Sequence, residues 1–164
     1  MKKLPLLVII LSVLFFSCKK NTAKCPYTVS GAVATQTEKD SIQRYLNANG
    51  ITATKDTSGV YYQVIKQGTG SAPTVCSNVT VKYRGTFFTG VAFDPSPSSG
   101  NTTSSASFAL GQVIVGWQKT LPYLKSGGSI DLYIPPSLGY GYSPYSTIPG
   151  GSYLKFTIEL VDVQ

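Results

Sequence analysis

The 164-residue chain contains no histidine and only seven acidic residues. Without histidine it cannot build a Ser–His–Asp triad, a histidine-ligated metal site or the usual proton shuttle near neutral pH. The carboxylates are spread singly along the sequence, so they do not form the spaced pair that glycoside hydrolysis requires. We therefore expect no metal, no cofactor and no conventional acid–base or covalent catalysis.

Cysteine is also scarce, with three residues in the chain: Cys18, Cys25 and Cys76. None of the intervals between them is the C-x-x-C spacing of a redox-active pair. In an oxidising compartment the isolated pair Cys25 and Cys76 is a candidate disulfide, which would close a loop of about 50 residues. Two buried free thiols are the alternative that the sequence leaves open.

The first 17 residues are typical of an export signal. Lys2 and Lys3 precede a mostly apolar run of 13 residues, 4–16. That run is too short to span a bilayer comfortably as a permanent helix, but it suits a signal sequence over residues 1–17. Ser17 and Cys18 at its end resemble the lipobox of bacterial lipoproteins, which implies cleavage and lipidation of Cys18. An ordinary signal peptide, or an uncleaved anchor, with a chance cysteine is the alternative.

The chain carries a formal net charge of +7, but its basic residues are scattered. The one cluster, Lys19, Lys20 and Lys24, lies beside the proposed lipid site, where basic side chains contact anionic headgroups or solvate a tether. We therefore expect a membrane contact through the lipid anchor and no nucleic-acid partner. The expected location is the bacterial cell envelope, with the domain facing the periplasm, because no acidic cluster follows Cys18.

Two short regions separate the signal from the main domain. Residues 18–36 are polar and weakly patterned, and they predict a lipidated tether. Residues 37–58 predict a short helix that Thr37 caps and Gly50 ends. A helix of this length is unstable alone, so its apolar face is expected to dock on the main domain or on a partner. That face consists of Ile42, Tyr45 and Leu46.

Residues 59–164 predict one domain of the α+β class. Period-two alternation of apolar and polar residues indicates five strands, and one short helical segment lies between the third and the fourth. No helix follows each strand, as parallel α/β folds require, so the sheet is expected to be antiparallel. The expected strands are 60–65, 79–85, 107–110, 129–134 and 153–160, and the expected helix is 117–124.

Five blocks of this domain carry aromatic, glycine and proline residues at set intervals. The blocks are Val81–Gly85 (V-x-Y-x-G), Gly90–Asp94 (G-x-x-F-D), Phe108–Trp117 (F-x-L-G then V-I-x-G-W), Ile134–Gly141 (I-P then Y-G) and Ile148–Leu160 (I-P then L-x-F-x-I-E-L). In this order they resemble the FK506-binding protein (FKBP) family over residues 59–163. No single block is specific, but five ordered blocks make coincidence remote.

This resemblance implies a strongly bent antiparallel sheet wrapped around one short α-helix, with an apolar pocket between them. It also implies peptidyl-prolyl cis/trans isomerase activity, which accelerates rotation about X-Pro bonds. Carried over position by position, Trp117 forms the floor of the pocket. The catalytic positions are Tyr83, Phe93, Asp94, Trp117, Tyr140 and Phe156, and the substrate-binding positions are Val113, Ile114 and Ile148, the last on a flap loop.

The predicted function is therefore an isomerase that acts on exported proteins from a membrane anchor. Its expected partners are proline-containing polypeptides, and the resemblance implies FK506-like macrolides as further ligands. Two departures from the family pattern support an alternative, a non-catalytic proline-peptide-binding or chaperone module of a membrane complex. Ala106 stands where the family often has an aromatic residue, and the 95–106 loop lacks the arginine that often accompanies the Asp94 position.

Overall fold

The computed structural model describes residues 24–94 and 105–164. The signal segment, the Cys18 lipidation site and most of the 95–106 loop lie outside the described residues. The elements in chain order are α1 (Gln36–Ala48), β1 (Thr54–Lys55), β2 (Tyr61–Lys66), β3 (Asn78–Phe87), β4 (Ala106–Ala109), the 3₁₀ turn η2 (Leu110–Gln112), α2 (Val115–Thr120), the 3₁₀ turn η3 (Leu121–Tyr123), β5 (Gly128–Ile134), the 3₁₀ turn η4 (Pro136–Leu138) and β6 (Leu154–Val163).

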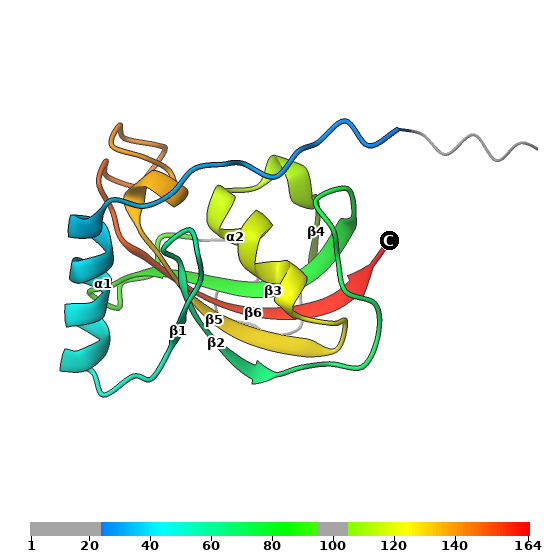
Figure 1. Cartoon of the computed structure of the whole chain (residues 1–164), viewed down its shortest axis with the longest axis horizontal. Coiled ribbons are helices and arrows are strands. Elements are labelled where there is room, and N and C mark those ends of the chain that lie inside the picture. Colours follow the sequence, from blue (N-terminus) through cyan, green and yellow to red (C-terminus); the bar gives the residue numbers. More distant parts are fainter. Residues whose placement is uncertain (1–23, 95–104) are drawn as a thin grey trace, which may run out of the picture.

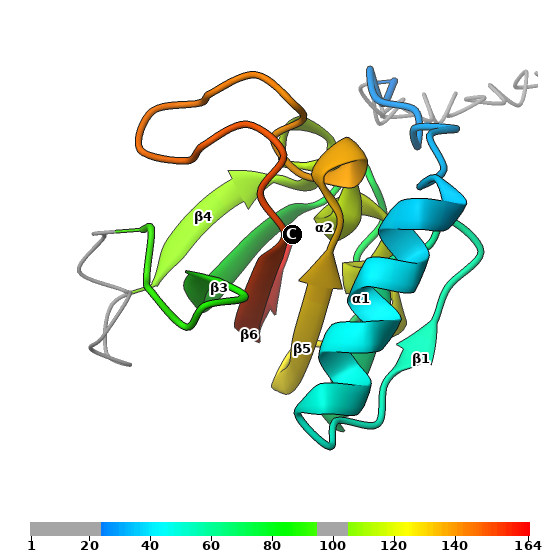
Figure 2. The same ribbon diagram turned by 90° about the vertical axis from the view of Figure 1, so that its left-hand side faces the viewer.

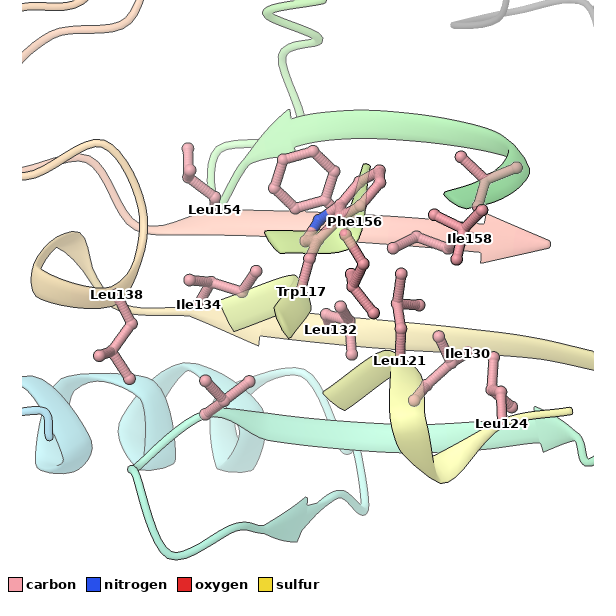
Figure 3. Close-up of a cluster of buried hydrophobic side chains, with 14 of the residues drawn as sticks. Trp117, Leu121, Leu124, Ile130, Leu132, Ile134, Leu138, Leu154, Phe156 and Ile158 are labelled. Carbon is pink, nitrogen blue, oxygen red and sulfur yellow. The ribbon is translucent and has the colours of Figure 1, made fainter. Parts of the chain in front are cut away.

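The six strands form one open antiparallel sheet in the order β1-β2-β5-β6-β3-β4, and α2 lies against one of its faces (Figure 1). Along β6 every second residue from Leu154 to Leu160 is buried, so one face of the sheet is apolar. Trp117, Leu121 and Leu124 follow the i, i+4, i+7 spacing of one helical face and pack on that apolar surface (Figure 3). The predicted fold class is confirmed.

Helix α1 packs on the opposite face of the sheet. Tyr61 and Tyr133 are paired across β2 and β5, and Leu132 beside them points into the core that contains α2. Because side chains alternate along a strand, the two tyrosines point to the other side. There they contact Ile42 and Leu46 of α1, which are 0% and 1% exposed. The prediction that this helix docks on the main domain is confirmed, and Figure 2 shows α1 alongside β5.

The cap of α1 differs from the predicted one. Thr35, not Thr37, caps the helix, with its backbone extended (φ −65°, ψ 160°). Its side chain accepts a hydrogen bond from the Glu38 backbone N–H at 3.3 Å, and the Glu38 carboxylate accepts one from the Thr35 N–H at 2.8 Å. This reciprocal box needs a long acidic side chain three residues after the cap. Thr37 has the shorter Asp40 at that place, and Asp40 bonds Gln36 instead.

The predicted tether over 18–36 is held against the domain in its described part. Cys25 and Cys76 form a disulfide, the first of the two alternatives from the sequence. The Tyr27 ring approaches Gly111 so closely that a Cβ there would collide with it. The Ala34 N–H donates to the Ser58 carbonyl at 2.8 Å. Residues 24–35 therefore form a strap along the α2 side of the molecule (blue in Figure 1). A disulfide and packing contacts hold this strap, and such contacts produce no periodic pattern in the sequence.

Other differences from the predicted elements are small. Strand β1 lies inside the region 37–58 that was predicted as a helical extension, and it pairs with β2. Its two residues are too few to show the alternation of apolar and polar side chains that indicates a strand. The pocket helix begins at Val115 and changes to a 3₁₀ turn at Leu121, since Pro122 has no N–H to continue it. Among residues 24–94 and 105–164, no helix is both long and apolar enough to cross a bilayer.

Reduction of the Cys25–Cys76 bond is expected to lower the free energy of unfolding by about 4 kcal/mol. The bond joins residues 51 apart, and it limits the conformational entropy of the unfolded chain. Urea unfolding with and without a reductant measures the difference. The double variant Cys25→Ser/Cys76→Ser is the control and should not respond to reductant. An unchanged midpoint in the parent would contradict the prediction.

Glu38→Gln is expected to cost about 2 kcal/mol at pH 7, and this cost should shrink at acid pH. Burial by itself raises the pKa of Glu38, but hydrogen bonds from Ser137 and Thr35 outweigh burial, and the pKa lies below its ordinary 4.5. A lowered pKa stabilises the fold above the unfolded-state pKa, and this stabilisation is lost as pH falls through the folded-state pKa. Unfolding of parent and variant between pH 7 and pH 3 tests this, with the exposed Asp40→Asn as control.

Candidate active site

A cavity of about 270 Å³ opens between α2, the sheet and the loops at one end of it. Trp117 comes from α2, Tyr83 from β3 and Phe156 from β6, so three elements distant in sequence meet here. The residues that line the cavity are Tyr83, Phe93, Asp94, Phe108, Gln112, Val113, Ile114, Trp117, Tyr140, Tyr145 and Phe156.

Edge-to-face aromatic packing fixes the floor. The Trp117 ring is 4% exposed, and its centroid lies 5.3 Å from that of Tyr83, 5.2 Å from Phe156 and 6.1 Å from Phe108, with interplanar angles of 80–88°. This geometry sets the positive edge of one ring against the negative face of the next. The Trp117 Nε1–H has no hydrogen-bond partner among the described residues, an uncommon state for a buried donor and one that functional sites tolerate.

Gly85 makes room for two walls of the cavity. A Cβ at Gly85 would lie 2.5 Å from the Phe93 ring, closer than real Cβ contacts allow, and 3.0 Å from the Phe156 ring, which is a tight contact. Those two rings are 5.5 Å apart and nearly perpendicular. The glycine of the V-x-Y-x-G block therefore has a steric role: any side chain there would push the aromatic walls apart.

The ionisable groups that line the cavity are tyrosine hydroxyls and the Asp94 carboxylate. Burial, a hydrogen bond with the Asp94 carboxylate and the charge of that group raise the pKa of Tyr83 well above its ordinary value. Burial, the neighbouring Tyr145 and the charge of Asp94 raise the pKa of Tyr140. Both hydroxyls therefore keep their protons at neutral and moderately alkaline pH: Tyr83 donates a hydrogen bond to Asp94, and Tyr140 can donate one to a bound ligand.

The flap, defined here as residues 142–150, adds an aromatic ring that the sequence did not predict. Tyr145 stacks on Tyr140 with centroids 4.7 Å apart and planes 16° from parallel. Tyr145 and Ile148 exchange two backbone hydrogen bonds of 2.9 Å, which makes Ser146 and Thr147 a two-residue turn. Ser146 has φ 52°, a left-handed conformation that costs about 1–3 kcal/mol and persists only where the surroundings hold it. The Thr147 hydroxyl contributes to that support by donating to the Phe93 carbonyl at 3.3 Å.

Of the residues predicted for the catalytic and substrate-binding pocket, the structure brings all but Ile148 to the cavity. Ile148 is buried in the core, 6% exposed, and does not line the cavity. Phe108, Gln112 and Tyr145 line it without having been predicted. Phe108 provides a wall of the cavity two residues after Ala106, the position where the family often has an aromatic residue. Phe108 could have been predicted, because it is the phenylalanine of the F-x-L-G block. Among residues 24–94 and 105–164, no three metal-ligating side chains gather into a possible metal site.

Comparisons with known proteins agree with this geometry. The family model of the FKBP-type peptidyl-prolyl cis-trans isomerase matches residues 70–161. The FKBP-type peptidyl-prolyl cis-trans isomerase FkpA of Escherichia coli (strain K12) is 38% identical over 126 residues, which cover 77% of this chain and 45% of that protein. FkpA of Buchnera aphidicola subsp. Schizaphis graminum (strain Sg) is 36% identical over 146 residues, 88% of this chain and 56% of its own length.

The crystal structure of FkpA from Escherichia coli matches with a TM-score of 0.68 at 36% identity, covering 78% of this chain and 60% of that one. The chain spans about half the length of the curated relatives it matches. The matched family model covers more than half of this chain, from Gly70 in the loop before β3 to Val161 in β6, and includes every residue that lines the cavity. The chain belongs to the FKBP-type peptidyl-prolyl cis-trans isomerase family.

Proposed function

We propose that the chain is a peptidyl-prolyl cis/trans isomerase that accelerates rotation about X-Pro bonds. The observation that carries this proposal is the aromatic cavity, whose floor and walls include the packed rings of Trp117, Tyr83 and Phe156. Two protonated hydroxyls, those of Tyr83 and Tyr140, stand at its edge. Such a site offers hydrogen bonds and an apolar surface, and X-Pro rotation needs no proton transfer.

The physical basis of catalysis is the difference in polarity between the planar and the twisted amide. Resonance gives the C–N bond partial double-bond character and a rotation barrier of about 18–20 kcal/mol. The twisted transition state has lost that resonance, so its carbonyl is less polar than in the planar ground state. An apolar aromatic wall therefore disfavours the ground state more than the transition state, which is the differential interaction that catalysis requires. A thousandfold acceleration needs only about 4 kcal/mol.

Two hydrogen-bond donors are placed to hold the peptide while its bond rotates. Ile114 precedes the first turn of α2 in an extended conformation (φ −57°, ψ 148°), and the N–H of a cap residue is not used inside its own helix. The Tyr140 hydroxyl supplies the second donor. In the proposed complex, the aromatic edges of Tyr83, Phe93 and Phe156 surround the carbonyl of the rotating X-Pro bond. Trp117 lies beneath the proline ring of the peptide.

The proposed setting is the bacterial cell envelope, with the domain anchored by lipid at Cys18 and facing the periplasm. The lipobox-like Ser17–Cys18 and the preceding apolar run support export. The Cys25–Cys76 disulfide also supports an oxidising compartment. The proposed substrates are proline-containing exported proteins, and FK506-like macrolides are proposed as ligands that compete for the same cavity.

Tyr140→Phe and Trp117→Leu are each expected to lower kcat/KM for short X-Pro peptides by about tenfold or more. Tyr140→Phe removes one hydrogen bond to the peptide, and a loss of about 1.4 kcal/mol is a factor of ten. Trp117→Leu removes the floor. A protease-linked peptide assay or exchange NMR measures the rate, and thermal unfolding checks that each variant is folded. Tyr123→Phe is the matched control, since Tyr123 stacks on Tyr62 away from the cavity.

The non-catalytic alternative gives a different outcome in the same samples. Trp117 is the only tryptophan in the chain, so its fluorescence reports occupation of the cavity by a peptide or a macrolide. A folded parent that changes its fluorescence with an X-Pro peptide but shows the uncatalysed rate would replace the isomerase by a binding module.

The rate constant kcat/KM is expected to change by less than about twofold between pH 6 and pH 9. The chain has no histidine, and the pKa values of Tyr83 and Tyr140 are raised above the ordinary tyrosine value. A raised tyrosine pKa keeps the hydroxyl protonated to higher pH, so both donors persist over this range. A pH profile with a fixed peptide tests the expectation, and a bell-shaped curve centred near neutrality would contradict it.

A further inference from the structure

Glu38 of α1 is a carboxylate with only 2% of its surface exposed. It lies before residues 70–161, the part of the chain that the family model matches. Removing a charged group from water is costly unless other groups bond it. A capping box requires only contacts with Thr35, and boxes of this kind form at exposed helix ends. The burial of Glu38 therefore indicates a second role.

The second set of contacts is with Ser137 of η4. Glu38 Oε1 accepts a hydrogen bond from the Ser137 backbone N–H at 2.9 Å, and Oε2 accepts one from the Ser137 hydroxyl at 2.9 Å. One carboxylate from α1 thus holds the start of the segment 137–142 with both of its oxygens.

Tyr140 lies inside this segment. The Gly141 N–H donates to the Pro136 carbonyl at 2.9 Å, and the Gly151 N–H donates to the Gly141 carbonyl at 2.9 Å. These local bonds set the shape of the turn. Glu38 ties that turn to a helix that is itself fixed on the sheet by Ile42 and Leu46. The position of the Tyr140 hydroxyl at the cavity therefore depends on α1 as well as on the strands.

We propose that Glu38 is a positioning residue for the isomerase site: through its carboxylate, α1 sets the place of the Tyr140 hydroxyl at the edge of the cavity. The inference rests on the proposed isomerase function. It makes α1 a working part of the active site, not a spacer between anchor and domain.

A double-mutant cycle on kcat/KM tests the proposal with the full chain. Glu38→Gln is expected to lower kcat/KM about tenfold in the parent, but less than twofold when Tyr140→Phe is already present, because Glu38 acts through the hydroxyl that this variant lacks. A residue that only stabilises the fold would have the same effect in both backgrounds, and that result would overturn the inference. Asp40→Asn, an exposed acid on the same helix, should match the parent. An equal loss in Asp40→Asn would also overturn it.

Two further measurements keep the test decisive. Where Glu38→Gln does not fold at the assay temperature, Ser137→Ala removes a hydrogen-bond partner of the carboxylate without touching the cap. It should lower kcat/KM in the parent and not in Tyr140→Phe, and no loss in the parent would refute the proposal. A parent without isomerase activity refutes the proposed function instead. The same cycle, run on peptide affinity by Trp117 fluorescence, then decides the role of Glu38.

Discussion

The Trp117 indole packs edge-on against Tyr83, Phe108 and Phe156, and the arrangement of the other pocket elements depends on this contact. The same ring belongs to the hydrophobic core and to the lining of the cavity. To place it, α2 must lie close to the sheet, and Gly85 of β3 must lack a side chain so that the Phe93 and Phe156 rings can close in beside it. Stability of the fold and geometry of the site therefore cannot vary independently, because the same side chains supply both.

The strands serve a second, smaller core on their other face. Leu132 packs toward α2, while its neighbour Tyr133 packs with Ile42 and Leu46 of α1. Tyr45 of α1 also stacks on Phe88 at 3.9 Å, which joins the helix to the end of β3. Helix α1 lies outside the residues that the family model matches, and it occupies the face of the sheet that alternation leaves free. Through Glu38 it also contacts the η4 turn that precedes Tyr140.

Much of the fold and most of the site could be predicted from the sequence, because short-range patterns encode them. These patterns involve residues that are close together in the sequence. They are the alternation along the strands, the short helical segment that begins at Trp117 and the five ordered blocks. What was missed depends on contacts between distant residues. The strap over residues 24–35 is held by Cys76 and Gly111, and the flap turn beside Tyr145 is held by the bond from Thr147 to the Phe93 carbonyl. Ile148 was expected at the cavity, but its side chain packs in the core with residues of the distant strands.

The disulfide has a geometric consequence for a protein anchored as we propose. Seven residue steps separate Cys18 from Cys25, and a fully extended chain covers at most about 3.6 Å per residue. The point at which the domain is covalently held can therefore rise no more than about 25 Å above the acylated cysteine. Without the bond between Cys25 and Cys76, the chain between Cys18 and the domain would lengthen by any part of the strap that detached. In a protein anchored in this way, the oxidised form would therefore keep the domain within a thin layer next to the bilayer, and reduction would widen that layer.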